Sequence, residues 1–130
     1  MKGLQLTLCE SDFNLLTNYC VENTLSAYNR NKLLIELKEA KVVKKENLPL
    51  NIVATGSKVL LWNIHKGHTY TIWIVPPAEA DGRKNKVSSL DPIAIALLGY
   101  PSGSVVEWEM GDEINQLKLL SVNQMDMEAA

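Results

Sequence analysis

Hydrophobic residues recur with two different periods along this chain, and the period changes near residue 47. In the first part, apolar residues return every three or four positions, the spacing of one face of an α-helix. One stripe consists of Phe13, Leu16 and Tyr19 or Cys20, and a second consists of Leu33, Leu34, Leu37 and Ala40. The pattern predicts two short amphipathic helices, separated by a break at residues 21–24, that pack as an antiparallel hairpin.

The expected helices are short. The first begins at Ser11 or Asp12, whose side chains can cap a helix, and the second runs from about Leu25 to Lys41. About 10 and 16 residues correspond to roughly 15 and 24 Å. On the second helix, Lys32 and Glu36 are spaced to pair one turn apart. The segment that follows, 41–49, is expected to be a charged linker.

After residue 47 the pattern is that of β-strands. Residues 58–64 and 69–75 are rich in β-branched and aromatic side chains, with Gly67 in a turn position between them. Residues 105–110 alternate between apolar and polar, and 116–122 supply a further strand. We expect an antiparallel sheet of about four or five strands.

One short helix is expected to pack on this sheet. Asp91 can cap it, Pro92 suits its first turn, and Gly99 can end it in a left-handed conformation. The residues between them are apolar on every side, so the helix must be buried. The predicted class is α+β, with a helical hairpin and linker at 1–47, a sheet domain at 48–124 and a tail at 125–130.

Composition and charge limit the function classes. The chain has 130 residues, 46% hydrophobic and 22% charged, with 13 basic and 15 acidic side chains. These values are typical of a globular domain, and no apolar run approaches the ~20 residues of a membrane span. A net charge of −2 argues weakly against binding to a nucleic-acid duplex. Without a recognisable signal peptide, the expected location is the cytoplasm.

Candidate chemistry is sparse. Cys9 and Cys20 lack metal or redox spacing and are expected to be reduced and half-buried. His65 and His68 are expected in an exposed hairpin turn without nearby carboxylates, so we predict no metal site there. We find no Gly-rich phosphate loop and no nucleophile–base pair. The sequence therefore predicts a binding protein without cofactor or catalytic residues.

Several segments together resemble a known family. Residues 87–99 read VSSLDPIAIALLG and residues 103–108 read GSVVEW. They are similar to the C-terminal domain of the bacterial Gre transcript-cleavage factors. Residues 36–43, 51–59 and 75–78 are similar to a short-hairpin branch, the regulator of nucleoside diphosphate kinase. The likeness extends over nearly the whole chain.

This resemblance implies an FKBP-like C-terminal domain behind a helical hairpin, and RNA polymerase core as the partner. Family members dock at the rim of the secondary channel, and in the cleavage factors a long hairpin presents two acidic residues that help hold a magnesium ion. Here the expected hairpin is short, and its tip offers Glu22, next to Asn23, with no second carboxylate. The resemblance therefore implies a polymerase-binding regulator that competes with cleavage factors and does not stimulate cleavage.

Candidate partner-binding residues follow from the same resemblance: Ser88, Ser89, Leu90, Asp91 and Pro92. Ser88 and Pro92 match the family motif, whereas the family's aspartate position holds Leu90, with Asp91 one place later. We expect a monomer that binds no specific nucleic-acid sequence and no membrane. Two alternatives stay open: an interaction module that regulates nucleotide metabolism independently of polymerase, and a peptidyl-prolyl isomerase suggested by the fold.

Overall fold

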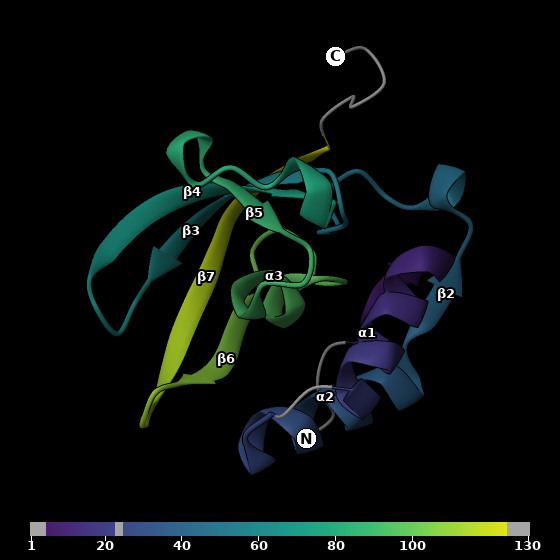
Figure 1. Ribbon diagram of the computed structural model, residues 1–130, viewed down its shortest axis with the longest axis horizontal. Coiled ribbons are helices and arrows are strands. Elements are labelled where there is room, and N and C mark those ends of the chain that lie inside the picture. Colours follow the sequence, from purple (N-terminus) through teal and green to yellow (C-terminus); the bar gives the residue numbers. More distant parts are fainter. Residues whose placement is uncertain (1–4, 23–24, 125–130) are drawn as a thin grey trace.

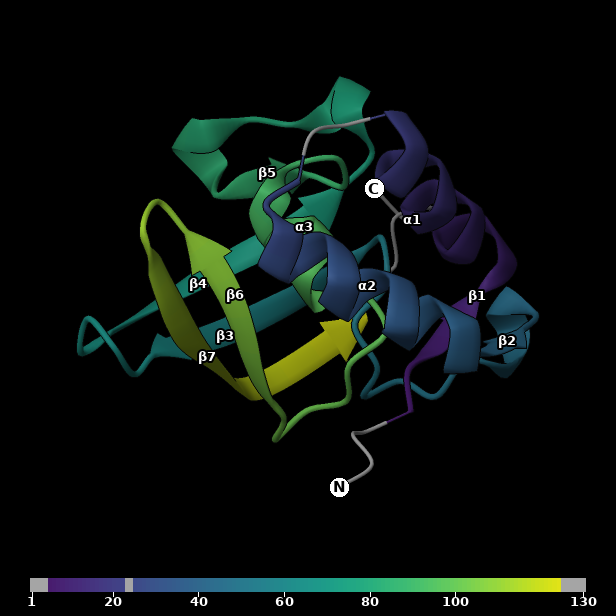
Figure 2. The ribbon, with the colours of Figure 1, turned by 90° about the horizontal axis from the view of Figure 1, so that it is seen from below.

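The computed structural model describes residues 5–22 and 25–124, and Figures 1 and 2 show the arrangement of its helices and strands. In chain order the elements are β1 (Thr7–Cys9), α1 (Glu10–Glu22), α2 (Ala27–Glu39), β2 (Lys41–Val43), β3 (Ser57–Asn63), β4 (His68–Val75), β5 (Lys86–Ser88), α3 (Pro92–Leu97), β6 (Val105–Met110) and β7 (Glu113–Gln124). Short 3-10 turns lie at Lys45–Asn47, Pro77–Glu79 and Gly82–Lys84.

The main sheet has five strands in the order β5-β4-β3-β7-β6. Three of its four pairings are antiparallel, but β5 runs parallel to β4. The predicted α+β class is confirmed, whereas the purely antiparallel sheet is wrong in this detail. After Val75 the chain crosses back through two 3-10 turns before it re-enters the sheet edge, which makes the parallel pairing possible. The sheet curls around α3 (Figure 1).

Helix α3 forms as the sequence predicts. The Asp91 side chain accepts a hydrogen bond from the Ile93 amide at 3.1 Å, and Pro92 occupies the first turn. Its residues 94–97 are all buried, as an all-apolar helix requires. Gly99 has φ +93, the left-handed conformation expected at the end of the helix.

Helices α1 and α2 run in opposite directions, which confirms the hairpin (Figures 1 and 2). Each is 13 residues long, so the first is longer and the second shorter than predicted. The buried stripe of α2 consists of Asn29, Leu33 and Leu37. Leu34 was expected in this stripe but is 46% exposed, because it lies about 100° around the helix from Leu33.

The hairpin shares one hydrophobic core with the sheet and α3. Leu16 and Leu33 from the two helices belong to the same buried cluster as Leu61, Ile95 and Leu117. Each amphipathic helix therefore buries its stripe against the sheet domain as well as against the other helix.

A two-stranded parallel sheet lies at the base of the hairpin. β1 pairs with β2 in the register Thr7 to Lys41 through Cys9 to Val43. Residues 41–49 were expected to form a linker, so this pairing was not predicted. Three-residue strands are too short to show a period, and their partners lie over 30 residues apart.

The surroundings of the cysteines and of His65 differ from what the sequence predicts. Cys9 and Cys20 are free and fully buried, more deeply than expected. The predicted absence of carboxylates near His65 is wrong: its Nε2 lies 3.0 Å from Glu113 Oε1, because β7 begins three residues earlier than predicted. Across residues 5–22 and 25–124, no group of three or more His, Cys, Asp or Glu could hold a metal ion.

Candidate functional site

The segment predicted to bind a partner forms a tight, exposed turn between β5 and α3. The Asp91 amide donates to the Ser88 carbonyl at 2.9 Å, and the Leu90 amide donates to Ser88 Oγ at 3.0 Å. The Ser89 amide donates to the Val75 carbonyl at 2.8 Å, which ties the turn to β4. These bonds hold Leu90 at the apex of the turn with 48% of its surface exposed.

The five predicted residues do not contribute equally to this surface. Ser88 is half-buried, and Leu90, Asp91 and Pro92 are exposed, so these four form one corner of the molecule, which we call the Leu90 corner. Ser89 is only 2% exposed, and its position anchors the turn. The Asp91 carboxylate already caps α3, so the most available apolar group of the corner is the Leu90 side chain.

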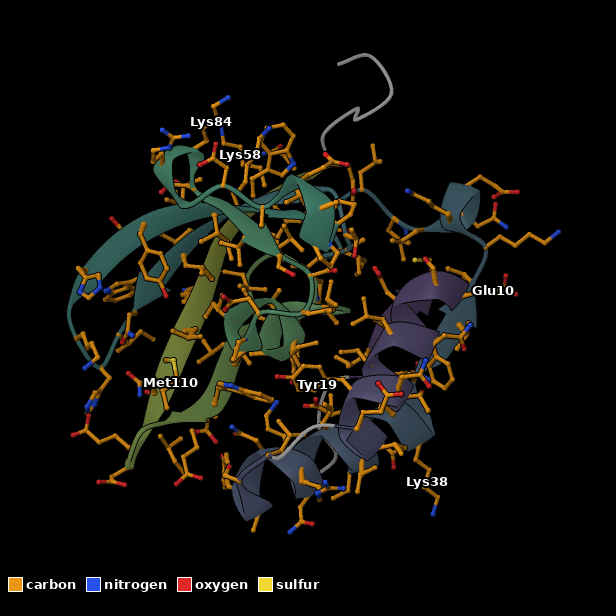
Figure 3. All side chains as sticks on the ribbon, in the orientation of Figure 1. Glu10, Tyr19, Lys38, Lys58, Lys84 and Met110 are labelled. Carbon is orange, nitrogen blue, oxygen red and sulfur yellow. The ribbon has the colours of Figure 1, made fainter. Side chains whose placement is uncertain are left out.

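A groove of about 400 Å³ begins at Pro92 and was not predicted from the sequence. It lies between the helical hairpin, the start of α3 and the β6 end, and its lining residues are Tyr19, Leu25, Ser26, Asn29, Pro92, Trp108, Glu109, Met110 and Gly111. Figure 3 labels Tyr19 and Met110, which stand on α1 and β6. Because Pro92 belongs to both features, the groove continues the surface of the Leu90 corner.

Tyr19, which lines the groove, interacts electrostatically with Asp91 of the Leu90 corner. Burial raises the pKa of its phenol, and the nearby Asp91 carboxylate raises it further. The hydroxyl therefore stays protonated at neutral pH and can donate a hydrogen bond from the groove wall.

An asparagine clamps the hairpin to the sheet at the other side of the groove. Asn29 Nδ2 donates to the Glu109 carbonyl at 2.9 Å, and the Glu109 amide donates to Asn29 Oδ1 at 2.8 Å. The side-chain amide thus pairs with edge strand β6 as one residue of a further strand would. Nearby, the Tyr28 hydroxyl donates to Glu107 Oε1 at 2.9 Å.

Two groups of polar contacts fix the rest of the hairpin. Lys32 Nζ lies 2.8 Å from Glu36 Oε2, as predicted, and 2.7 Å from the Tyr100 hydroxyl, which also donates to Glu36. At the base, buried Asp12 accepts hydrogen bonds from the Thr55 amide at 3.0 Å and the Thr55 hydroxyl at 2.8 Å. The helices therefore fold back onto the sheet domain and do not extend away from it.

The hairpin tip offers little chemistry among the described residues. Glu22 is the last residue of α1 and is exposed to solvent. Asn23, the other predicted tip residue, lies outside the described residues. No helix in the described part of the chain is long and apolar enough to cross a membrane.

Comparisons with known proteins agree with this arrangement. Residues 48–124 match the family described as "Transcription elongation factor, GreA/GreB, C-term". Over 88 residues the chain is 32% identical to transcription elongation factor GreA of Acetivibrio thermocellus and 38% identical to GreA of Thermoanaerobacter pseudethanolicus. These alignments cover 68% of this chain and 55% and 56% of those proteins, so the chain spans a little over half the length of the relatives it matches.

Solved structures show the same fold over more of the chain. A GreA/GreB elongation factor from Nitrosomonas europaea superimposes with a TM-score of 0.66 at 24% identity, covering 93% of this chain and 99% of that one. Gfh1 of Thermus aquaticus gives a TM-score of 0.51 at 16% identity, with the same coverage. Because the family match extends over more than half of the residues, this chain belongs to the GreA/GreB transcription elongation factor C-terminal family.

Proposed function

We propose that this protein is a regulator of transcription elongation that docks on RNA polymerase through the Leu90 corner. On this proposal it occupies the secondary-channel rim, competes with transcript-cleavage factors there, and does not stimulate cleavage itself. It acts by binding and not by catalysis.

The observation that carries the proposal is the exposed corner within the family domain. The resemblance implies that the turn before α3 contacts the polymerase, and here Ser88, Leu90 and Pro92 share one exposed turn. Family members with an aspartate at the Leu90 position would offer a charged contact. An exposed leucine favours an apolar contact instead, worth up to ~2 kcal/mol when fully buried.

The short length of the hairpin and the small number of acidic residues at its tip both argue against cleavage stimulation. Two-metal chemistry requires carboxylates that reach the catalytic centre and help hold the second ion. Helices of 13 residues extend only about 20 Å, and Asn29 ties α2 to the sheet edge. The tip contributes a single acid among its described residues, Glu22.

The test is a competition on stalled elongation complexes that contain backtracked RNA. A GreA-type cleavage factor is added at a fixed concentration, and this protein is titrated into the reaction. We expect cleavage to fall progressively as the protein displaces the factor, and we expect no cleavage from the protein alone. A Leu90→Lys variant should inhibit at least tenfold less strongly, because it offers neither the apolar contact of leucine nor the acidic contact of the family's aspartate, and its charge cannot be buried without a partner.

A matched control separates docking from general damage. Leu50 is 74% exposed in the loop before β3 and lies beside Val122 and Gln124, not in the Leu90 corner, so Leu50→Lys should inhibit like the unmodified protein. Cleavage stimulated by the protein alone would refute the non-cleaving role. Full factor-driven cleavage at saturating protein would refute rim competition and favour an interaction module that acts independently of polymerase.

A further inference from the structure

The sheet face that points away from α3 carries a concentration of aromatic and basic side chains. Along β3, the buried side chains of residues 57, 59, 61 and 63 alternate with Lys58, Leu60 and Trp62, which point to the opposite face. Cross-strand pairing places further residues beside them. We call this surface the outer sheet face: Lys58, Leu60, Trp62, Thr69, Thr71, Trp73, Lys86, Lys118 and Leu120.

Strand register arranges these residues in two rows. In one row, Trp73 of β4 lies between Lys58 of β3 and Lys86 of β5, and Lys86 Nζ lies 4.6 Å from the centroid of the indole ring. In the other, Trp62 of β3 lies between Thr69 of β4 and Lys118 of β7. Each tryptophan therefore has a lysine on a neighbouring strand.

The two rows are four residues apart along β3, or roughly 13 Å. Trp62 is 37% exposed, which is unusual for so large an apolar side chain. Leu120, 40% exposed, lies at the bulge of β7 and extends the apolar part of the face. The surface thus combines an open aromatic ring at one end with a pair of lysines at the other.

The charged residues listed for the outer sheet face are all lysines. The outward positions of β3 and β5 carry Lys58 and Lys86, those of β4 carry no charge, and the stretch 116–123 of β7 carries Lys118 and no acid. Across residues 5–22 and 25–124, no carboxylate lies within 4.0 Å of the ammonium groups of Lys58, Lys86 or Lys118. Figure 3 shows Lys58 and Lys84 together on this side of the sheet.

Acidic residues lie at the borders of this surface. Glu107 and Glu109 occupy outward positions of the edge strand β6, beyond Lys118 on the same side of the sheet, and Glu107 accepts a hydrogen bond from the Tyr28 hydroxyl. Asp81, in the loop before β5, lies 3.5 Å from the Arg83 guanidinium. The lysines between these borders are therefore available to an anionic partner.

We propose that the outer sheet face binds single-stranded nucleic acid without sequence preference. Bases stack on the Trp62 ring, and phosphates contact Lys118 beside it and the Lys58 and Lys86 row beyond. The exposed Trp62 ring with Lys118 on the next strand matches a single strand, whose bases present free faces, better than a duplex, whose base faces are stacked. An acidic protein would form ion pairs with the lysines but would not need to stack on the Trp62 ring.

The test measures binding of a fluorescein-labelled 12-nucleotide oligouridylate by fluorescence anisotropy, with the full chain and no polymerase. We expect a Kd between about 1 and 100 µM at physiological salt and a lower Kd at low salt. Three phosphate contacts should give log Kd a slope of about two against log salt, since each contributes about 0.7 on single strands. Binding should also quench tryptophan emission. Trp108 is buried, so the change in emission should come from Trp62 and Trp73 on the outer sheet face.

Variants assign the contacts. Trp62→Ala should weaken binding roughly tenfold and remove most of the quenching. Lys118→Gln should lower the salt slope by about 0.7, whereas Lys38→Gln should leave it unchanged. Lys38 is the matched control because it is exposed on α2, on the other side of the molecule (Figure 3).

Three outcomes would overturn the proposal. The first is no anisotropy change at 100 µM protein and low salt, and the second is wild-type binding by Trp62→Ala. The third is equal affinity for a glutamate polymer, which would show an acidic-protein surface instead. Because the assay contains no polymerase, these outcomes are distinguishable from failure of the proposed docking at the Leu90 corner.

Discussion

Replacing Asn29 by alanine tests whether the hairpin is clamped to the sheet as the structure indicates. The substitution removes both hydrogen bonds to Glu109 and leaves the amide and carbonyl of an edge strand without their partners. Each such bond contributes about 1 kcal/mol net. Water can reach the vacated position from the adjoining groove, so the full penalty of an unpaired buried group does not apply.

The expected loss is therefore about 2 kcal/mol of unfolding free energy. For a chain of this size, a loss of 1 kcal/mol lowers the Tm by about 4 °C, so we expect Asn29→Ala to melt roughly 8 °C lower. Hydrogen exchange monitored by NMR gives a sharper readout. The Glu109 amide loses its acceptor and should exchange at least tenfold faster than in the unmodified protein.

A second variant separates the clamp from the stability of α2 itself. Ser26 caps α2 by accepting a hydrogen bond from the Asn29 amide at 3.1 Å, and Ser26→Ala should cost about 1 kcal/mol. That change does not touch β6, so the Glu109 amide should keep its protection. Unchanged Tm and unchanged Glu109 exchange in Asn29→Ala would refute the clamp.

Further predictions concern a glycine and a tyrosine. Gly99→Ala should cost about 3 kcal/mol in urea unfolding, because the residue has φ +93 and an added Cβ would lie 2.9 Å from Leu8 Cδ2. Gly103→Ala, with φ +92 and nothing within 4 Å, should lose only about 1 kcal/mol, and equal losses would contradict the close approach. Burial and the neighbouring Glu36 carboxylate raise the pKa of the Tyr100 phenol in the folded protein. The unfolded chain has an ordinary tyrosine pKa of about 10, so the protonated phenol contributes its full stabilisation below about pH 10, and this contribution is lost as the pH rises further. The urea midpoint of Tyr100→Phe should therefore fall less steeply between pH 9 and 11 than that of the unmodified protein, and parallel curves would be evidence against this linkage.

Local signals in the sequence were sufficient for several elements of the fold. Helix α3 could be placed because its cap, its first-turn proline and its terminal glycine all lie within nine residues. The β3–β4 hairpin could also be predicted, since two segments rich in β-branched and aromatic residues flank Gly67. In each case the determining interactions are between near neighbours in the chain.

Features that depend on distant segments were not predicted. The β1–β2 pairing and the parallel β5 join short strands whose partners are set by the path of the chain. Asn29 looked like an ordinary polar residue, and only the fold brings it to Glu109, 80 positions away. The groove beside Pro92 was missed for the same reason.

The residues of the candidate site come from the family resemblance, and their role in binding stays a prediction. Leu90 and Pro92 lie together on an exposed corner, but the side chain of Ser89 is buried because its amide is bound to β4. A turn sequence does not reveal which of two adjacent serines faces the core.

Direct binding to purified core RNA polymerase tests the central claim most simply. Fluorescently labelled protein is titrated with polymerase, and the Kd is compared for the unmodified chain, Leu90→Lys and Leu50→Lys. We expect a measurable Kd that rises at least tenfold for Leu90→Lys and changes less than twofold for Leu50→Lys. Polymerase binding by Leu90→Lys with the affinity of the unmodified protein would contradict docking through the Leu90 corner.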